Sequence, residues 1–547
     1  MSASGMNPKK CMGALCALVA VLLSGAQPRA AAQRHPYTIA HELRYATAED
    51  ITGLNPHLAS QATVHYLSSL TMAWLTKTGP HNEAIPELAL VVPTQANGGV
   101  SKDGRTITWH LRRDAKWSDG APFTADDVVF STAAVLNPRN NETGRSGWDL
   151  ITKVDEPDKY TVIYHLKHAL AGFEYGFFST AGANPCILPK HILGKLSEIN
   201  DAPYNALPVG IGPFKYVSWR RSDSVEMVAD QLYFGKRPKL QKIVFKIIPD
   251  RNTVLTQLRT HELDMWLPVT AHYYPQIKAI RGIMIVQRPG YVFDHLDFNI
   301  AHPIVADSRV RRALRLAIDR KDLLAKIQNG LGSVQDSPVG PANPAHDPHL
   351  GTTPFDLAAA RKLLDDAGWK PGSGGIRANG GRRLVLDFAT SVGTPDSDTR
   401  IELIRGWWKQ IGVDFVVKHY PSPLLFGAFA DGGIINTGKF DVVGFAWGGD
   451  PIGDLSNLYE CDQIPPAGQN DVHYCNRAVD AAMERFKLTL SAAARQPLTN
   501  FVQAAIVRDA PTIVLDTRDD IFAFNSDLTG FQPNQLSPFD ELANADI

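Results

Sequence analysis

Residues 100–131 read VSKDGRTITWHLRRDAKWSDGAPFTADDVVFS and contain the signals of a strand followed by a capped helix. Apolar and polar residues alternate in TITWHLR, which is typical of a strand with one buried face. The residues on that face are Ile107, Trp109 and Leu111. Further on, Thr124 can cap a helix whose first turn carries Asp126 and Asp127, and Pro138 prevents this helix from continuing. The stretch therefore predicts a strand and a helix in succession.

The same two patterns recur toward the C-terminus. Alternating strands are predicted in KIVFKIIPD, 242–250, and in RLVLDFAT, 383–390. Helices are predicted from Thr353 to Gly368 and between Asp307 and Gly330. In the second of these helices, three arginines are expected to form a solvated face, namely Arg311, Arg312 and Arg315. Mixed strands and helices of this kind indicate an α/β protein built from lobes.

The composition excludes some classes of protein. At 547 residues the chain is too long for one hydrophobic core, so two or three domains are expected. After the N-terminal segment, no apolar run approaches the roughly 18 residues of a membrane-spanning helix. Removal of Lys9, Lys10 and Arg29 with that segment changes the formal charge from −1 to −4. This balance argues against a nucleic-acid or anionic-membrane partner.

The first 32 residues have the pattern of a secretory signal peptide. Lys9 and Lys10 precede an apolar run from Cys11 to Leu23, and alanines follow at the end of the segment. We expect cleavage after Ala32, and release into the periplasm. The alternative is a buried N-terminal helix.

Three cysteines remain in the exported chain: Cys186, Cys461 and Cys475. The last two enclose a loop rich in Pro, Gly and Asn, and a disulfide between them would contribute about 3 kcal/mol in the loop-entropy estimate. A metal-binding pair is the alternative, although no C-x-x-C is present. We expect the disulfide, with Cys186 free, and no metal.

The sequence contains no G-x-S-x-G, H-E-x-x-H or Walker motif, which removes the commonest classes of enzyme without excluding every enzyme, and we expect no catalytic residues and no cofactor. The candidate site is FDVVGFAWGGD, 440–450, where an apolar run ends in Trp447, Gly448, Gly449 and Asp450. Glycines let a backbone approach a guest, and the indole and the carboxylate supply contacts. The alternative is that Asp450 only caps the turn ahead of Pro451.

Segment 100–131 closely resembles the signature of family 5 of the extracytoplasmic solute-binding proteins, which serve ABC importers and bind peptides, nickel or oligosaccharides. The matching residues are Trp117, Asp119, Gly120, Pro122, Phe123, Thr124, Ala125, Asp127 and Val128. The resemblance continues in the family's order through 208–216, 250–265, 308–319, 359–369, 445–461 and 473–483. The chain is most similar to the dipeptide-binding branch in its last segments.

The resemblance implies a periplasmic-binding-protein fold with two α/β lobes around a cleft and an extra subdomain in lobe I. Lobe I is expected at 33–290 and again at 513–547, and lobe II at 291–512, with the crossings near two extended stretches, 288–299 and 509–520. The resemblance also implies a monomer that delivers a peptide or another small polar solute to an inner-membrane permease.

In peptide-binding relatives an aspartate at the place of Asp450 receives the ligand's α-ammonium, and Trp447 could add apolar or cation–π contact. Dipeptide binders tend to place an arginine for the ligand's carboxylate where this chain has Ser391–Ser397, which contains none. Arg400 and Arg405 follow nearby. Longer peptides, opines or another small polar solute are therefore alternatives to a dipeptide. A carrier of a nickel chelate, haem or an oligosaccharide is the alternative among binding proteins, and a secreted hydrolase is the alternative from another class.

Overall fold

The computed structural model describes residues 34–547, apart from residues 60, 146, 182, 183 and 394. The predicted signal peptide, 1–32, lies outside the described residues. Residues 37–547 form one unit, which carries the fold. No helix among the described residues is long and apolar enough to cross a membrane.

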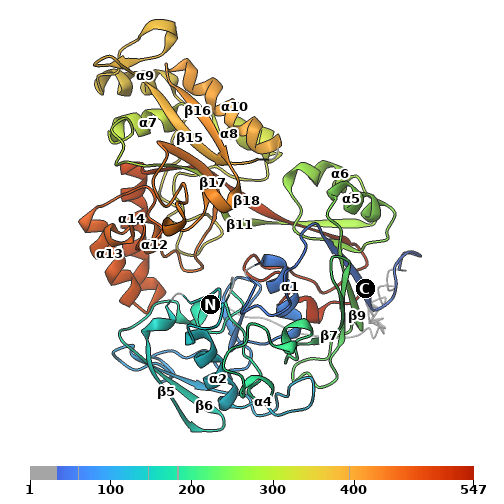
Figure 1. Ribbon diagram of the computed structural model, residues 1–547. Coiled ribbons are helices and arrows are strands. Elements are labelled where there is room, and N and C mark those ends of the chain that lie inside the picture. The colour runs from blue at the N-terminus through green and yellow to red at the C-terminus, as the bar shows by residue number, and fades with distance from the viewer. Residues whose placement is uncertain (1–33, 60, 146, 182–183, 394) are drawn as a thin grey trace, which may run out of the picture. The chain divides into compact units, whose positions relative to one another are not determined.

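An 11-stranded mixed sheet runs through this unit (Figure 1). In spatial order its strands are β16 (Asp414–Tyr420), β15 (Val385–Ser391), β17 (Val442–Gly448), β11 (Ile283–Phe298), β18 (Thr512–Asn525), β10 (Met265–Trp266), β1 (Glu42–Thr47), β9 (Lys242–Ile247), β8 (Ser224–Ala229) and β7 (Phe214–Arg220), with β12 (Gly332–Ser333) beside β18. The strands predicted at 242–250 and 383–390 are confirmed as β9 and β15.

The long antiparallel strands β11 and β18 join the two ends of this sheet. β11 pairs with β17 through residues 292–298 and with β18 through residues 283–297. β18 in turn pairs with β10, which is followed by β1 and β9. The extended stretches where lobe crossings are expected fall on these two strands. The lobe boundaries themselves stay a prediction.

The stretch 100–131 folds as the sequence predicts. Its strand is β4 (Thr106–His110), at the edge of a three-stranded sheet with β6 (Thr161–Leu166) and β5 (Ile151–Asp158). Its helix is α2 (Ala125–Leu136), where the backbone N–H of Thr124 donates to the Asp127 carboxylate over 3.0 Å. Trp109 is fully buried in the local core. Two smaller ribbons pair β2 (Thr76–Thr78) with β3 (Ala84–Pro86) and β13 (Ala378–Asn379) with β14 (Arg382–Arg383).

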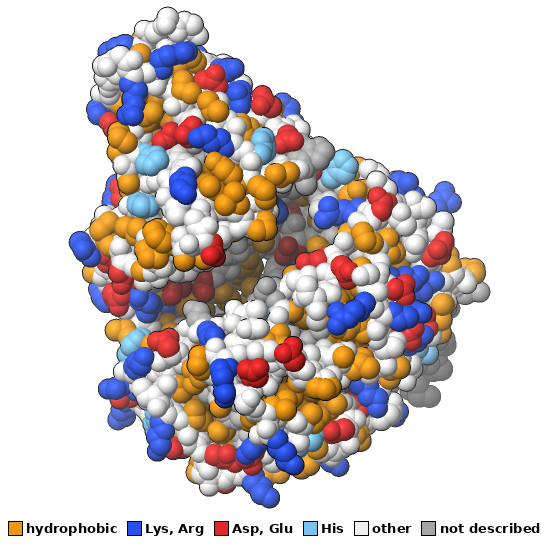
Figure 2. All heavy atoms as spheres, in the orientation of Figure 1, with side chains coloured by type: hydrophobic (Ala, Val, Ile, Leu, Met, Phe, Trp, Pro, Cys, Tyr) orange, Lys and Arg blue, Asp and Glu red, His pale blue; other side chains and the backbone are white. Residues whose placement is uncertain are grey.

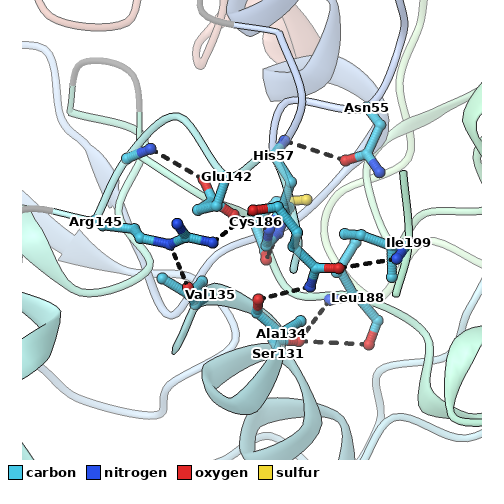
Figure 3. A network of polar contacts seen from close by, with 12 residues as sticks. Asn55, His57, Ser131, Ala134, Val135, Glu142, Arg145, Cys186, Leu188 and Ile199 are labelled. Carbon is cyan, nitrogen blue, oxygen red and sulfur yellow. Dashed lines mark hydrogen bonds and ion pairs between the residues drawn. The ribbon is translucent and has the colours of Figure 1, made fainter. Parts of the chain in front are cut away.

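A buried polar network holds the loops beyond α2 (Figure 3). The His57 ring lies 2.5 Å from Glu142 Oε2 through Nδ1 and 2.8 Å from the Cys186 carbonyl oxygen through Nε2. Burial disfavours the charged imidazole, but the Glu142 carboxylate and the Cys186 carbonyl outweigh it and raise the pKa of His57 to about 10. Beside it, Arg145 donates to the Val135 carbonyl, one of the carbonyls left open at the end of α2.

The remaining helices flank the sheets (Figure 1). They are α1 (Ala62–Thr71), α3 (Phe173–Gly176), α4 (Lys190–Leu193), α5 (Arg251–Arg259), α6 (Tyr274–Lys278), α7 (Ser308–Leu316), α8 (Arg320–Ile327), α9 (Leu357–Asp366), α10 (Pro395–Gln410), α11 (Ser422–Leu425), α12 (Ser456–Tyr459), α13 (Arg477–Leu488) and α14 (Ala492–Asp509). The helix predicted from Thr353 is confirmed as α9. The helix predicted between Asp307 and Gly330 is two helices, because Asp319 caps α8 by accepting from the Asp322 N–H.

The prediction of a solvated arginine face on α7 is wrong for two of its three members. Arg312 is exposed, but Arg311 and Arg315 are buried. Arg311 donates to the carbonyls of Asp509 and Ala510, at the C-terminal end of α14, and to two carbonyls ahead of α7. A guanidinium has five donors in a fixed plane, so it can satisfy several helix-end carbonyls at once.

Candidate functional site

A cavity of about 540 Å³ lies where the end of β17 meets β11, α12, α13 and the segment after β6. Its volume is within the range of small-molecule sites. Trp447, Gly448, Gly449 and Asp450, the residues predicted from the sequence, all line it. On the side of the segment after β6, the Ala171 N–H donates to the Lys487 carbonyl over 2.8 Å. Figure 2 shows a hollow in one face of the molecule, with acidic side chains inside it.

The Asp450 carboxylate does cap the turn that follows it. Its Oδ1 accepts from the backbone N–H groups of Ile452 at 2.9 Å and Asp454 at 3.0 Å. Its Oδ2 has no hydrogen bond or ion pair with any described residue, and the side chain is exposed to the cavity. Surrounding protein atoms and the nearby Asp454 carboxylate raise the pKa of Asp450 to about 6. The turn-capping and ligand-binding interpretations are therefore compatible, because they use different oxygens.

The two residues ahead of Asp450, Gly448 and Gly449, are glycines for different structural reasons. A Cβ at Gly448 would meet no atom within 4 Å, so its side of the backbone is open. A Cβ at Gly449 would lie 2.9 Å from the Tyr291 carbonyl oxygen, which also accepts from the Gly449 N–H. Gly449 therefore allows the close approach to β11, whereas Gly448 leaves room in the cavity. Trp447 is half-buried and lies with its ring 6.0 Å from that of Phe445.

The cavity wall carries more acid than the sequence analysis found. Asp454 and Glu460 also line the cavity, and among the lining residues Lys487 is the one basic side chain. Lys487 lies 2.9 Å from Glu460 Oε2, while Glu460 Oε1 is buried without a partner among the described residues. Burial disfavours the charged form of Glu460 more than Lys487 stabilises it, and this raises the pKa of Glu460 to about 7. The carboxylates exceed the cations, so the cavity favours a cationic guest.

Arg400 and Arg405, the two arginines that follow segment 391–397 in the sequence, do not line this cavity. Arg400 binds Asp294 over 2.6 Å, and Arg405 lies over the Phe415 ring and near Asp414. The structure thus offers no arginine along the described lining for a ligand carboxylate. Sequence reasoning missed Lys487 because it is far from the glycine motif in sequence, and it missed Glu460 because no local pattern shows that the chain after the turn returns to the same cavity. Asp454, in contrast, lies within the same GDPIGD turn and could have been found.

The predicted disulfide is confirmed. Cys461 and Cys475 are bonded to each other, and Cys186 is free and buried. The Asp480 carboxylate lies near the two sulfur atoms and accepts a hydrogen bond from the backbone N–H of Cys461. Because the sulfurs are joined, they are not thiolate ligands for a metal.

Three comparisons place the chain among known proteins. The sequence model described as bacterial extracellular solute-binding proteins, family 5 Middle, matches residues 83–464. Protein XP55 of Streptomyces lividans is 29% identical over 432 residues, which cover 78% of this chain and 75% of that protein. The oligopeptide-binding protein AppA of Bacillus subtilis is 25% identical over 427 residues, covering 77% and 76%.

Solved structures share the fold. AppA of Bacillus subtilis in complex with a nonapeptide superimposes with a TM-score of 0.74 at 23% identity, covering 92% of this chain and 98% of that one. NikZ of Campylobacter jejuni in complex with Ni(L-His) gives a TM-score of 0.76 at 23% identity, covering 93% and 100%. The α/β fold expected from the sequence is confirmed as that of the binding proteins. These two structures share the fold, but one holds a peptide and the other a nickel chelate, so the fold alone does not identify the class of solute.

Proposed function

The chain belongs to the bacterial extracellular solute-binding proteins of family 5, and on this premise we propose that it captures a peptide in the periplasm and delivers it to an ABC transporter. The ligand's α-ammonium binds Asp450, and Trp447, Gly448 and Gly449 form the adjoining wall. Export by cleavage after Ala32, a monomeric state and the lobe boundaries belong to the same proposal.

One observation carries the peptide assignment. Asp450 presents Oδ2 to the cavity while backbone N–H groups hold Oδ1. The carboxylate is thus oriented before a ligand arrives, and it forms no ion pair with a described residue, since the Arg495 guanidinium interacts with it only at longer range. An ammonium has three donors and one positive charge, so it can satisfy Oδ2 and offset the repulsion between the Asp450 and Asp454 carboxylates. Neutral sugars supply no such charge.

The test is a double-mutant cycle on Asp450 and the peptide amino group. We expect Asp450→Ala to weaken binding of a free peptide by about 2–5 kcal/mol, because it removes a charge-assisted pair. Asp450→Asn should fall between the wild type and the alanine variant, since its side-chain oxygen can still cap the turn. N-acetylation of the peptide should weaken the wild type strongly and the alanine variant hardly at all. Calorimetric titration of the four combinations gives the coupling.

The control is Asp431→Asn, which removes the same charge from an exposed residue that lines neither of the cavities described in this structure. It should bind free and acetylated peptides as the wild type does. Simple additivity of the Asp450 substitution and acetylation would contradict the proposed contact. Titration with the nickel–histidine complex should give no heat of binding; saturable binding of that complex, with no response to peptides, would replace peptide by metal chelate as the solute.

A further inference from the structure

A second cavity, of about 230 Å³, adjoins the main one. The two share three lining residues, Phe293, Trp447 and Leu458. We call this second cavity the side pocket. It is below the size range of sites that hold a whole small molecule, so it suits one side chain of a ligand whose main part lies in the larger cavity.

The pairing of β11 with β17 builds one wall of the side pocket. Phe293 pairs with Trp447 and His295 with Phe445 in the register of the two strands. Residues two apart in a strand face the same side, and directly opposite residues share that side. The His295 ring accordingly lies 5.0 Å from Phe293 and 4.3 Å from Phe445. Phe426 adds a further ring, 5.7 Å from Phe445.

The side pocket also contains two carboxyl groups, from Asp297 and Asp471. His295 Nε2 lies 3.1 Å from Asp297 Oδ2, and the Thr512 hydroxyl donates to Asp297 Oδ1 over 2.5 Å. Asp471 comes from the loop closed by the disulfide. Burial and the Asp297 carboxylate hold the pKa of Asp471 well above its usual range.

His295 Nδ1, on a side chain that is 3% exposed, lacks a hydrogen-bond partner among the described residues. Asp471, which is 6% exposed, bonds to the Asp297 carboxylate through a proton that the two carboxyl groups share, and no other described residue donates to its Oδ2. Buried polar atoms are rarely left unpaired, and each such atom needs an explanation. Both residues line the side pocket, so a donor entering it could satisfy His295 Nδ1 and take the place of the proton shared by Asp471 and Asp297.

The charges decide which donor fits. The described lining of the side pocket contains no lysine or arginine, and its one basic group, His295, already faces Asp297. A cation with several donors would compensate the two carboxyl groups. The aromatic rings around it would accept the alkyl stem of a long side chain and attract its charge.

We propose that the side pocket is a side-chain subsite that selects a ligand residue with a cationic end, lysine or arginine. The inference rests on the proposed function, because the subsite is reached from the cavity that holds the peptide. When the cation enters, Asp471 ionises and its proton passes to solvent, so the cation replaces a proton beside Asp297. An uncharged side chain of the same length leaves that proton in place.

The experiment compares tripeptides that differ in one side chain. Calorimetric titration uses Xaa-Ala-Ala and Ala-Xaa-Ala, with Xaa as alanine, norleucine, lysine, arginine or glutamate. In one of the two positions we expect lysine or arginine to bind at least about tenfold more tightly than norleucine, and glutamate to bind most weakly. Repeating the titrations in buffers of different ionisation enthalpy should show proton release with lysine and none with norleucine.

Asp471→Asn should reduce the preference for lysine over norleucine to within about twofold while leaving norleucine affinity unchanged. Asp431→Asn, the matched surface control, should keep the preference. Equal affinity for lysine and norleucine in both positions would overturn the subsite, and so would a preference that survives in Asp471→Asn. If the variant does not fold, the wild-type ratio decides alone. Absence of binding by every tripeptide would refute the proposed function and, with it, the subsite.

Discussion

Strand β11 has a buried aspartate on each of its faces, Asp294 on one and Asp297 on the other, and the two have different surroundings. On one face Asp294 is 1% exposed and accepts from Arg400 at 2.6 Å and from Arg518 at 2.5 Å. These arginines outweigh the cost of burial and lower the pKa of Asp294 to about 2. On the other face Asp297 and Asp471 meet one imidazole and no guanidinium among the lining residues of the side pocket.

The difference separates structural charge from charge available to a ligand. A buried carboxylate with two arginines is already compensated, and removing it would leave cations without a partner. A carboxyl group beside a cavity, with an unsatisfied atom, can be compensated by a guest instead. The same reasoning applies to Asp450, which has backbone donors on one oxygen and open space at the other.

The largest effect should come from breaking the compensated site. Asp294→Asn keeps the shape of the side chain but removes the charge between Arg400 and Arg518, so we expect it to lower the free energy of unfolding by about 3–5 kcal/mol. Denaturant titration at neutral pH measures this loss. Because the folded-state pKa is depressed, the wild type should itself lose this stabilisation as the pH falls from about 4 toward 2.

Asp516 is the residue that could replace Asp294. It pairs with Asp294 across the sheet, and burial together with the Asp294 charge raises its pKa to about 7. In Asp294→Asn it would ionise more readily, so a variant with Asp516→Asn added should be less stable still. A loss below about 1 kcal/mol in both variants would show that the arginines do not depend on these carboxylates.

An intermediate effect should appear in the pH dependence of peptide affinity. An ammonium binds the ionised form of Asp450, whose pKa is raised to about 6, so affinity should fall as the pH decreases. Between pH 7 and pH 5 we expect a loss of about tenfold. Glu460, with its pKa raised to about 7, adds its own part. The profile of Asp450→Asn therefore serves as the reference, and identical profiles for the two proteins would contradict the contact.

The smallest effect should come from the uncompensated site. Asp471→Asn replaces a carboxyl group whose neutral form is favoured in the folded protein, so little charge is lost. We expect the free energy of unfolding without ligand to change by less than about 1 kcal/mol. The same denaturant titration as for Asp294→Asn gives a direct comparison of two buried aspartates. Equal losses in the two variants would remove the distinction between them.

The sequence predicted features that depend on neighbours in the chain. The alternation in TITWHLR and the acids after Thr124 specify β4 and α2, because strand faces and helix caps are set within a few residues. The candidate wall from Trp447 to Asp450 was likewise predicted, since its residues follow one another at the end of β17. Asp454 lies in the turn that follows Asp450, so its place near Asp450 could also have been predicted from the sequence.

The residues that the sequence analysis missed come together only in the folded chain. Arg311 is buried because α14 ends beside α7, which no periodicity within α7 can indicate. Asp297 and Asp471 share the side pocket because of the register of β11 and the course of the loop between Cys461 and Cys475. Sequence periodicity gives the face of an element on which a residue lies. The groups that contact that residue, and therefore whether its charge is compensated, depend on packing between distant segments.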